Sequence, residues 1–347
     1  MSKSFQTICA TLFAAALALP TAAQEPRMPT GPLSIESQGS FFVGGREVRS
    51  DALSTLPAYA PSGTITVDQM YVRYQVPVST AGRRPVTLIH GCCLTGKTWE
   101  TTPDGRMGWD EYFVRRGHPT YVIDQAWRGR SAASPAGINR VRTGRAPVDE
   151  LPTVFSAGHE PAWAIFRFGA EYPQVFPGML FPLEAQGEFW KQMVPDWLNS
   201  LPTPNPTVPA LSELAGKLDG TVLVSHSQSG IYPFQTAALS RTGIAGIVSI
   251  EPGACPEANG DMAPYRGLPI LVLFGDYVEL SPRWAPRLKA CREFVQAANA
   301  AGGKAELAVL PDMGIRGNSH MLMQDRNSLE IADWLVGWIG KNVGPKG

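Results

Sequence analysis

Short runs of apolar residues recur along the chain after Pro85, and most of them end at a polar or ionisable residue. Continuous apolar runs of four to eight residues are typical of strands that are buried on both faces, as in a parallel sheet. Helical stretches separate several runs, notably residues 284–301 and 327–339. This alternation predicts an α/β fold with an open, mostly parallel central sheet and flanking helices. The runs are residues 86–89, 120–123, 221–224, 244–250, 269–274 and 305–310.

Two segments ahead of Pro85 have a different pattern. Residues 33–42 and 64–78 alternate polar and apolar positions and contain many β-branched and aromatic side chains. A period of two is typical of a strand that buries one face and exposes the other. We therefore predict an antiparallel pair of strands at one edge of the sheet.

Residues 131–216 interrupt the alternation of strands and helices. Ten of the 46 residues from 155 to 200 are aromatic, against 9% in the whole chain, and Pro and Gly are frequent. The segment is too long for a simple crossover and too apolar for a solvated loop. It predicts a lid inserted between strands and covering an apolar pocket. An ordinary packed subdomain without a gating role fits the same composition, and both interpretations stay open.

The first 23 residues have the features of a secretory signal peptide. Lys3 is their only charged residue, residues 8–19 form an apolar run, and small residues lead up to Ala23. The run is too short to span a bilayer, which argues against an uncleaved anchor. Cleavage near Ala23 predicts a periplasmic or secreted protein without membrane association, in which residues 24–347 form a single domain.

Composition and charge narrow the class of protein further. The 347 residues include 44% hydrophobic residues, and 30 Lys+Arg balance 30 Asp+Glu. Disordered chains combine low hydrophobicity with high net charge, so this class is excluded. A neutral chain also lacks the positive field that attracts phosphate groups, so no nucleic-acid partner is expected.

The segment Ser225-His226-Ser227-Gln228-Ser229 carries the strongest chemical signal. An apolar strand precedes it and a predicted helix, residues 229–239, follows it. Strand, tight turn and helix around a central serine form a nucleophile elbow, here with serine in place of glycine at both flanks. A serine-rich helix cap is the alternative interpretation. The elbow predicts Ser227 as a nucleophile.

A serine hydroxyl needs a base, and the base needs a group that orients it. His320 follows the last predicted strand and precedes the last helix, and the chain order of serine, acid and histidine is that of α/β-hydrolases. Two acids compete for the third place. Asp276 follows the run that ends at 274, and Glu251 follows the preceding run. The sequence pattern alone does not separate them.

Acyl transfer also requires two N–H donors that face the developing oxyanion. We expect one from Gln228 and the other from the loop that contains Cys92 and Cys93. Four cysteines remain after signal cleavage. A bond between adjacent cysteines would be strained, because neighbouring Cα atoms are about 3.8 Å apart. Free thiols, or long-range bridges to Cys255 and Cys291, therefore stay open. Neither the cysteines nor the histidines have metal-ligand spacing.

At these positions the sequence resembles the bacterial esterase 713 family of α/β-hydrolases, over most of the chain after the signal peptide. The resemblance implies that Glu251 is the catalytic acid. It also implies two disulfides, Cys92–Cys93 at the oxyanion hole and Cys255–Cys291. The motifs that carry it are His90-Gly91-Cys92-Cys93, Ser225-His226-Ser227-Gln228-Ser229-Gly230, Glu251-Pro252-Gly253, Phe274-Gly275-Asp276, residues 284–291 and Gly317-Asn318-Ser319-His320.

These observations predict an exported serine esterase. It would hydrolyse carboxylic esters with an apolar moiety through an acyl-enzyme, with Ser227, His320 and Glu251 as the triad. We expect a small-molecule ester as the partner and neither a metal nor a cofactor, and a homodimer stays open. Alternatives are a lactonase or an amide or carbamate hydrolase with the same triad. A non-catalytic exported binding protein on the same fold is an alternative from a different class.

Overall fold

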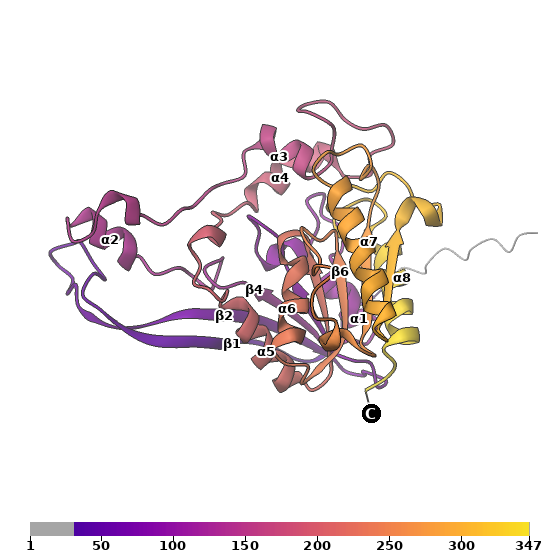
Figure 1. The fold of residues 1–347 in the computed structure, drawn as a ribbon, viewed down its shortest axis with the longest axis horizontal. Helices are drawn as coiled ribbons and strands as arrows, with labels where there is room; N and C mark the ends of the chain where they lie inside the picture. The colour runs from indigo at the N-terminus through magenta and orange to yellow at the C-terminus, as the bar shows by residue number, and fades with distance from the viewer. Residues whose placement is uncertain (1–30, 347) are drawn as a thin grey trace, which may run out of the picture.

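The computed structural model describes residues 31–346, and its centre is one eight-stranded sheet (Figure 1). The strand order is β1-β2-β4-β3-β5-β6-β7-β8. Neighbouring strands from β4 to β8 are parallel, whereas β1 and β2 form an antiparallel pair at one edge. Both features confirm the predicted sheet. The strands are β1 (Ile35–Ser50), β2 (Gly63–Pro77), β3 (Val86–Ile89), β4 (Thr120–Asp124), β5 (Thr221–His226), β6 (Ile244–Ile250), β7 (Pro269–Phe274) and β8 (Lys304–Val309).

Helices cover both faces of the sheet because side chains of the buried strands alternate between the two faces. Val222 and Val224 of β5 belong to the core beneath α1 and α8, whereas Leu223 belongs to the core beneath α5, α6 and α7. Each fully buried side chain of this kind contributes about 1.5–3 kcal/mol. These helices are α1 (Trp109–Arg115), α5 (Thr207–Leu218), α6 (Tyr232–Leu239), α7 (Ala285–Ala300) and α8 (Ser328–Asn342).

The predicted edge pair is present, but its first strand is longer than expected. β1 stays paired with β2 up to Ser50, eight residues beyond the predicted end at position 42. The strand passes through Gly44 and Gly45, whose φ angles are 63° and 88°. Most residues beyond them are exposed, so the alternation of polar and apolar positions that marks a half-buried strand is missing there.

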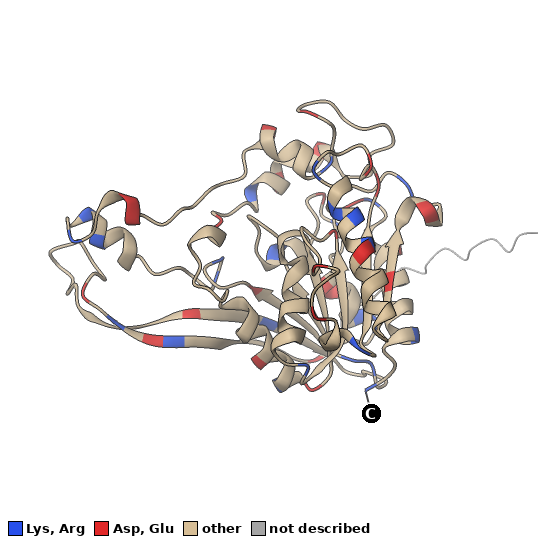
Figure 2. Cartoon of the chain, viewed as in Figure 1, with Lys and Arg blue, Asp and Glu red and all other residues tan. Residues whose placement is uncertain are grey.

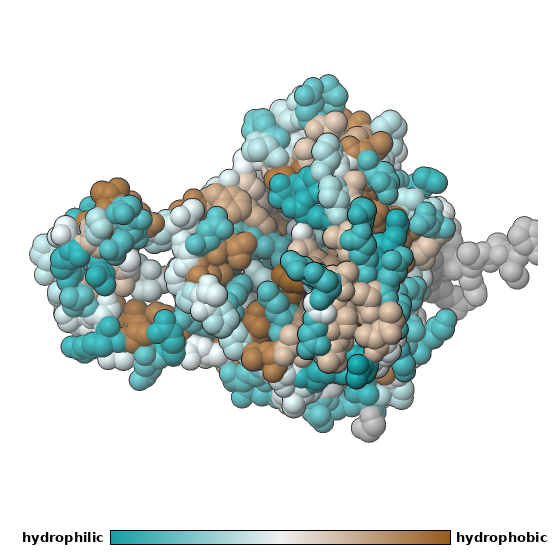
Figure 3. Space-filling model, in the orientation of Figure 1, coloured by the Kyte–Doolittle hydropathy of each residue, from teal (hydrophilic) through white to brown (hydrophobic). Residues whose placement is uncertain are grey.

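The extended pair forms an arm that projects from the body of the protein, with α2 (Ala136–Arg142) at its tip (Figure 1). The Asn139 side chain donates to the Ala52 carbonyl at 2.9 Å and joins the helix to the β1–β2 connection. Hydrophobic surface is visible on this tip (Figure 3). Leu56 and Val148 contribute to it, with 61% and 74% of their surface exposed.

The segment 131–216, predicted as a lid, leads from β4 out to the arm and back over the body (Figure 1). It contains α2, α3 (His159–Ile165) and α4 (Gln186–Lys191). Its last residues already belong to α5, which packs on the sheet, so the part outside the sheet layers ends before Thr207. A gating role of this segment remains a prediction.

Short 3-10 helices connect many of these elements. Three of them matter for the site: η1 follows β3, η5 follows β5 and η7 follows β8. The 3-10 helices are η1 (Gly96–Trp99), η2 (Val148–Glu150), η3 (Leu183–Ala185), η4 (Leu198–Ser200), η5 (Ser227–Ile231), η6 (Ala263–Tyr265) and η7 (Leu310–Met313).

The signal peptide predicted for residues 1–23 lies outside the described residues. Within residues 31–346, none of the helices combines the length and the apolar character that a bilayer span requires. Acidic and basic residues are interspersed over the face seen in Figure 2, in keeping with the balanced charge of the sequence.

Candidate active site

The turn after β5 places Ser227 at the carboxyl edge of the sheet. Its φ angle is 59°, in the left-handed region that non-glycine residues rarely adopt. The flanking Ser229 is buried, and its Oγ lies 3.0 Å from the His226 carbonyl and 3.1 Å from the Ile89 carbonyl. The same hydroxyl accepts the His226 N–H at 3.3 Å. Unlike the glycine of the usual elbow, this serine thus hydrogen-bonds with the backbone of the turn through its hydroxyl.

The ring of His320 lies directly beside Ser227. The loop between η7 and α8 carries His320, and its Nε2 is 2.8 Å from Ser227 Oγ. Its N–H donates to the Phe166 carbonyl at 2.9 Å, and its carbonyl lies 2.8 Å from His226 Nε2. The Trp284 ring packs against the imidazole, with 4.2 Å between ring centroids. These contacts fix the buried imidazole from several sides.

The structure places the two candidate acids in different positions. Glu251, directly after β6, has its Oε2 3.1 Å from His320 Nδ1, and both side chains are buried. The carboxylate of Asp276 instead accepts the N–H groups of Tyr277 at 2.7 Å and Gly317 at 2.8 Å. Glu251 is therefore the carboxylate behind the imidazole. Asp276 ties the end of β7 to the loop that carries His320.

Burial and neighbouring charges keep Glu251 ionised and His320 neutral at neutral pH. These are the protonation states that a general base and its orienting acid require. Burial raises the pKa of Glu251, but the nearby Arg167 and the hydrogen bonds from His320 and Arg167 outweigh this and lower the pKa to about 2. Burial lowers the pKa of His320 to about 4, although Glu251 acts in the opposite direction. At neutral pH, Nδ1–H can donate to the carboxylate while Nε2 is free to accept a proton from Ser227.

The loop after β3 brings backbone N–H groups close to the serine. A Cβ at Gly91 would lie 2.9 Å from Ser227 Cβ, so only glycine permits this approach. The N–H groups of Cys92 and Gln228 have no acceptor within residues 31–346. The N–H of Cys93, where φ is 59°, donates at 3.1 Å to a buried carboxylate. Of the three predicted oxyanion donors, Cys92 and Gln228 remain free and Cys93 does not.

The predicted Cys92–Cys93 disulfide stays a prediction. The two Sγ atoms lie 2.7 Å apart, which is longer than the S–S bond of about 2.05 Å and shorter than an ordinary contact between two thiols. The second predicted bridge, Cys255–Cys291, is present and joins the loop after β6 to α7.

Asp196 is a residue of the candidate site that the sequence pattern did not reveal. Its buried carboxylate accepts the Cys93 N–H at 3.1 Å and the Gln228 side-chain amide at 3.0 Å. It also forms a buried ion pair with Arg128, with 2.6 Å between the closest atoms. The segment 131–216 thus contributes a charged group that connects the loop of Cys92 and Cys93, called the oxyanion loop below after its predicted role, to the elbow.

Arg167 is the second residue that sequence analysis missed. Its buried guanidinium donates two hydrogen bonds to Glu251, each 2.5 Å long. One local signal was available, because Arg167 stands between Phe166 and Phe168 in an apolar stretch. A charge among residues destined for the core requires a buried partner. Nothing in the sequence indicated which carboxylate that partner would be.

Three side chains of metal-ligating types lie close together beside the elbow. The ligand atoms of Cys92, Cys93 and Asp196 are within 4.8 Å of one another. The Asp196 oxygens already accept hydrogen bonds from backbone, amide and guanidinium donors. This donor set serves the hydrogen bonding of the loop better than it fits a cation.

An apolar cavity of about 130 Å³ opens beside Ser227. Its walls come from the oxyanion loop, from residues 155–158 and from α3, so the segment 131–216 supplies much of the lining. The hydrophobic lining side chains include Leu94, Phe155, Pro161, Ala162, Ile165 and Phe166. Such a cavity fits the hydrocarbon part of a small molecule whose reactive group lies at the serine.

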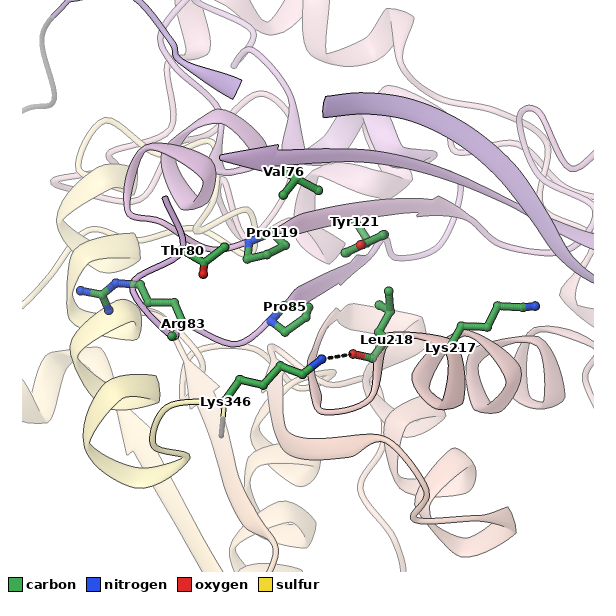
Figure 4. A pocket seen from close by; sticks show the side chains of 10 residues that line it. Val76, Thr80, Arg83, Pro85, Pro119, Tyr121, Lys217, Leu218 and Lys346 are labelled. Atoms are coloured by element: carbon green, nitrogen blue, oxygen red, sulfur yellow. Dashed lines mark hydrogen bonds between the residues drawn. The ribbon is translucent and has the colours of Figure 1, made fainter. Parts of the chain in front are cut away.

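A larger cavity of about 470 Å³ lies at the opposite ends of the strands. Pro85 and Pro119, which precede β3 and β4, form part of its wall (Figure 4). Arg83 and Lys346 also line it, and Lys346 Nζ donates to the Leu218 carbonyl at 3.0 Å. Because the elbow is at the carboxyl ends of the strands, the smaller cavity is the candidate active site.

Two known proteins resemble this chain over most of its length. The solved structure of a protein described as a novel bacterial esterase is 63% identical, with a TM-score of 0.90, and the match covers 92% of this chain and 99% of that one. The probable secreted lipase phiG of a fungal species (strain ATCC 74256) is 25% identical over 319 residues, covering 78% of this chain and 86% of the lipase. No family model matches the chain.

Proposed function

The chain belongs to a bacterial esterase family of α/β-hydrolases and is a carboxylic ester hydrolase, and on this premise we propose that Ser227, His320 and Glu251 form its catalytic triad. The observation that carries the proposal is the continuous relay of contacts, 2.8 Å from Ser227 Oγ to His320 Nε2 and 3.1 Å from His320 Nδ1 to Glu251. Nucleophile, base and orienting acid are thereby in hydrogen-bonding reach of one another.

In the proposed reaction, Ser227 Oγ attacks the ester carbonyl carbon as His320 Nε2 accepts its proton. Glu251 holds the imidazole in place and stabilises the imidazolium. The free N–H groups of Cys92 and Gln228 donate to the negatively charged carbonyl oxygen. His320 then protonates the departing alcohol, which leaves an acyl-enzyme, and a water molecule activated by the same imidazole releases the acid.

A fluorophosphonate that forms a covalent bond with activated serines tests this proposal. One equivalent of the probe should abolish ester hydrolysis, and peptide mass spectrometry should place the adduct on Ser227. Pretreatment with a slow ester substrate should protect the serine and slow the labelling. An inactivated enzyme that carries its adduct on another residue would refute the triad.

The apolar cavity supports a substrate with a hydrophobic moiety next to the carbonyl. Across straight-chain esters of one chromogenic alcohol, we expect kcat/KM to rise by up to about fourfold per methylene, since each buried CH₂ contributes about 0.8 kcal/mol. The rise should stop once the cavity of about 130 Å³ is full. Ala162→Leu, which fills the cavity, should move the optimum to a shorter chain. A flat profile in both proteins would contradict this assignment.

The protonation of His320 determines the pH at which kcat/KM falls on acidification. Because burial lowers the pKa of this base to about 4, the imidazole stays neutral at pH 5 and gains a proton only on further acidification. We expect kcat/KM of the wild type to reach half its plateau value near pH 4, measured with an ester whose alcohol does not titrate there. A half-point near 6.5, the ordinary value for histidine, would contradict the buried neutral state.

We also propose that the protein is exported with removal of the signal peptide. The apolar run and the small residues before position 24 support this, as does the description of the fungal relative as a probable secreted lipase. Amino-terminal sequencing of the protein from a periplasmic or culture fraction should give a start near Gln24. An exported protein that begins at Met1 would rule out cleavage.

A further inference from the structure

Arg167 places a positive charge directly on the carboxylate of the proposed triad. Its Nη1 and Nη2 each lie 2.5 Å from one oxygen of Glu251, and its Nε donates to the Asp276 carbonyl at 2.9 Å. Nη1 is also 3.4 Å from His320 Nδ1. The side chains of Arg167 and Glu251 have no exposed surface. Water therefore does not screen the guanidinium from either triad member.

The backbone of the arginine is connected to the loop of His320. Its backbone has a φ of 56°, and the preceding residue, Phe166, accepts the N–H of His320 through its carbonyl at 2.9 Å. The residue thus reaches the triad from a backbone that is itself bonded to the loop of the catalytic base. A change in the segment around Phe166 would move both the charge and the imidazole.

The net charge of Arg167, Glu251 and His320 indicates how the arginine affects the protonation of His320. A buried ionised group is costly unless an opposite charge compensates it. The charges of Arg167 and Glu251 already sum to zero, so a proton on His320 would leave an uncompensated positive charge in the site. Without Arg167, a proton on His320 would be the nearest way to balance the buried Glu251. The same imidazole would then be held protonated and could not accept the serine proton.

We propose that Arg167 is a positioning residue that neutralises Glu251 and thereby keeps His320 unprotonated, ready to act as the base. The inference rests on the proposed function, because it assigns a further residue to that triad. It predicts that the pH at which kcat/KM falls on acidification depends on Arg167 as well as on the burial of His320.

Other ionisable groups also face His320, and the substitutions in the test leave all of them in place. His226, at the end of β5, has its ring centroid 4.7 Å away and is neutral, since burial lowers its pKa well below the usual value. Arg283, before α7, is exposed to solvent, which screens its charge. Asp325, in the loop of His320 itself, is buried, which raises its pKa to about 7. None of these groups contacts Glu251 as Arg167 does.

The test compares pH profiles of Arg167→Met, which removes the charge, and Arg167→Lys, which retains it. For Arg167→Met, we expect the acid limb of kcat/KM to move up by about 1–3 pH units, the range that a neighbouring charge produces. KM on the plateau should stay within about threefold, because the arginine does not touch the substrate. Arg167→Lys should keep the limb within about half a unit of the wild type. An unshifted limb in Arg167→Met overturns the proposal.

A double variant separates charge balance from a merely structural role. Arg167→Met/Glu251→Gln removes both charges, so no proton is needed on His320 and the limb should return to within about half a unit of the wild type. Its kcat should stay low because the orienting carboxylate is gone. A limb that remains raised in the double variant overturns charge balance. This variant buries no unpaired charge, so it keeps the test decisive if Arg167→Met fails to fold.

Two controls distinguish failure of this inference from failure of the triad. Arg73→Met removes a guanidinium from another arginine–carboxylate pair, with Asp110, away from the triad, and should leave the profile unchanged. Fluorophosphonate titration counts the competent sites in each preparation. A wild type labelled away from Ser227 refutes the triad itself. A wild type labelled at Ser227, together with unshifted Arg167 variants, refutes only the role of Arg167.

Discussion

Replacement of Ser227 by alanine is expected to lower kcat by about 10⁶, the scale on which loss of a triad nucleophile acts. The change deletes the Oγ that lies 2.8 Å from His320 Nε2 and that would form the acyl bond in the proposed reaction. It keeps the Cβ and the φ of 59°, so the elbow should keep its shape. Hydrolysis of a chromogenic ester, followed over hours at high enzyme concentration, measures the residual rate.

Ser225 offers a matched control for this substitution. It is a buried serine two residues before Ser227, but its Oγ has no hydrogen-bond partner among the described residues. Ser225→Ala removes the same atom from the end of β5, just before the turn, and should change kcat by less than about threefold, since no bonded group is lost. If both variants lost activity equally, the hydroxyl of Ser227 would have no special role and the acyl-enzyme route would be refuted.

The central strands could be predicted because they are buried on both faces. The apolar runs correspond to β3 through β8 with end shifts of at most a few residues, as in β5, which extends to His226 rather than to residue 224. The outer half of β1 could not be predicted, since its residues are mostly exposed and carry no period. The predicted end of the inserted segment, at 216, falls inside α5 for a related reason. The start of α5 follows a proline-rich stretch and resembles it in composition.

The order of elements predicted the positions of Ser227 and His320, but it could not choose the acid. β6 and β7 are adjacent parallel strands, so the residues that follow both reach the same edge of the sheet. The choice depends on side-chain direction after each strand. Glu251 has a φ of 52°, and its carboxylate lies against the imidazole, whereas Asp276 bonds to the backbone of the neighbouring loop. No feature of the sequence indicates that the backbone of Glu251 adopts the left-handed conformation.

Arg167 and Asp196 were not predictable because their partners are distant in the chain. Arg167 bonds to Glu251, 84 residues away, and Asp196 bonds to Cys93, 103 residues away. Apolar patterning indicates which residues become buried, but it does not pair buried charges. Both residues lie in the segment interpreted as a lid or a packed subdomain. Their hydrogen bonds show that parts of this segment are built into the site itself.

Glu251→Gln is expected to lower kcat far more than Asp276→Asn, by up to about 10⁴ against less than about tenfold, because in the proposed triad only Glu251 holds the tautomer of His320. Asp276 accepts two backbone N–H groups, and asparagine retains one acceptor for them. The rates of both variants should be measured per titrated site, under conditions where unfolding is excluded by circular dichroism. The opposite order of losses would assign the acid to Asp276.

Stability has to be separated from catalysis in this comparison, since glutamine leaves the buried Arg167 without its counter-charge. Breaking a buried ion pair on one side costs about 3–5 kcal/mol of unfolding free energy. The variant Arg167→Met/Glu251→Gln removes the unpaired charge and should regain most of that stability. If the fall in kcat came from a distorted fold, the double variant would recover activity as well. We expect it to recover stability alone, because the proposed triad still lacks the carboxylate that orients His320 and holds its tautomer.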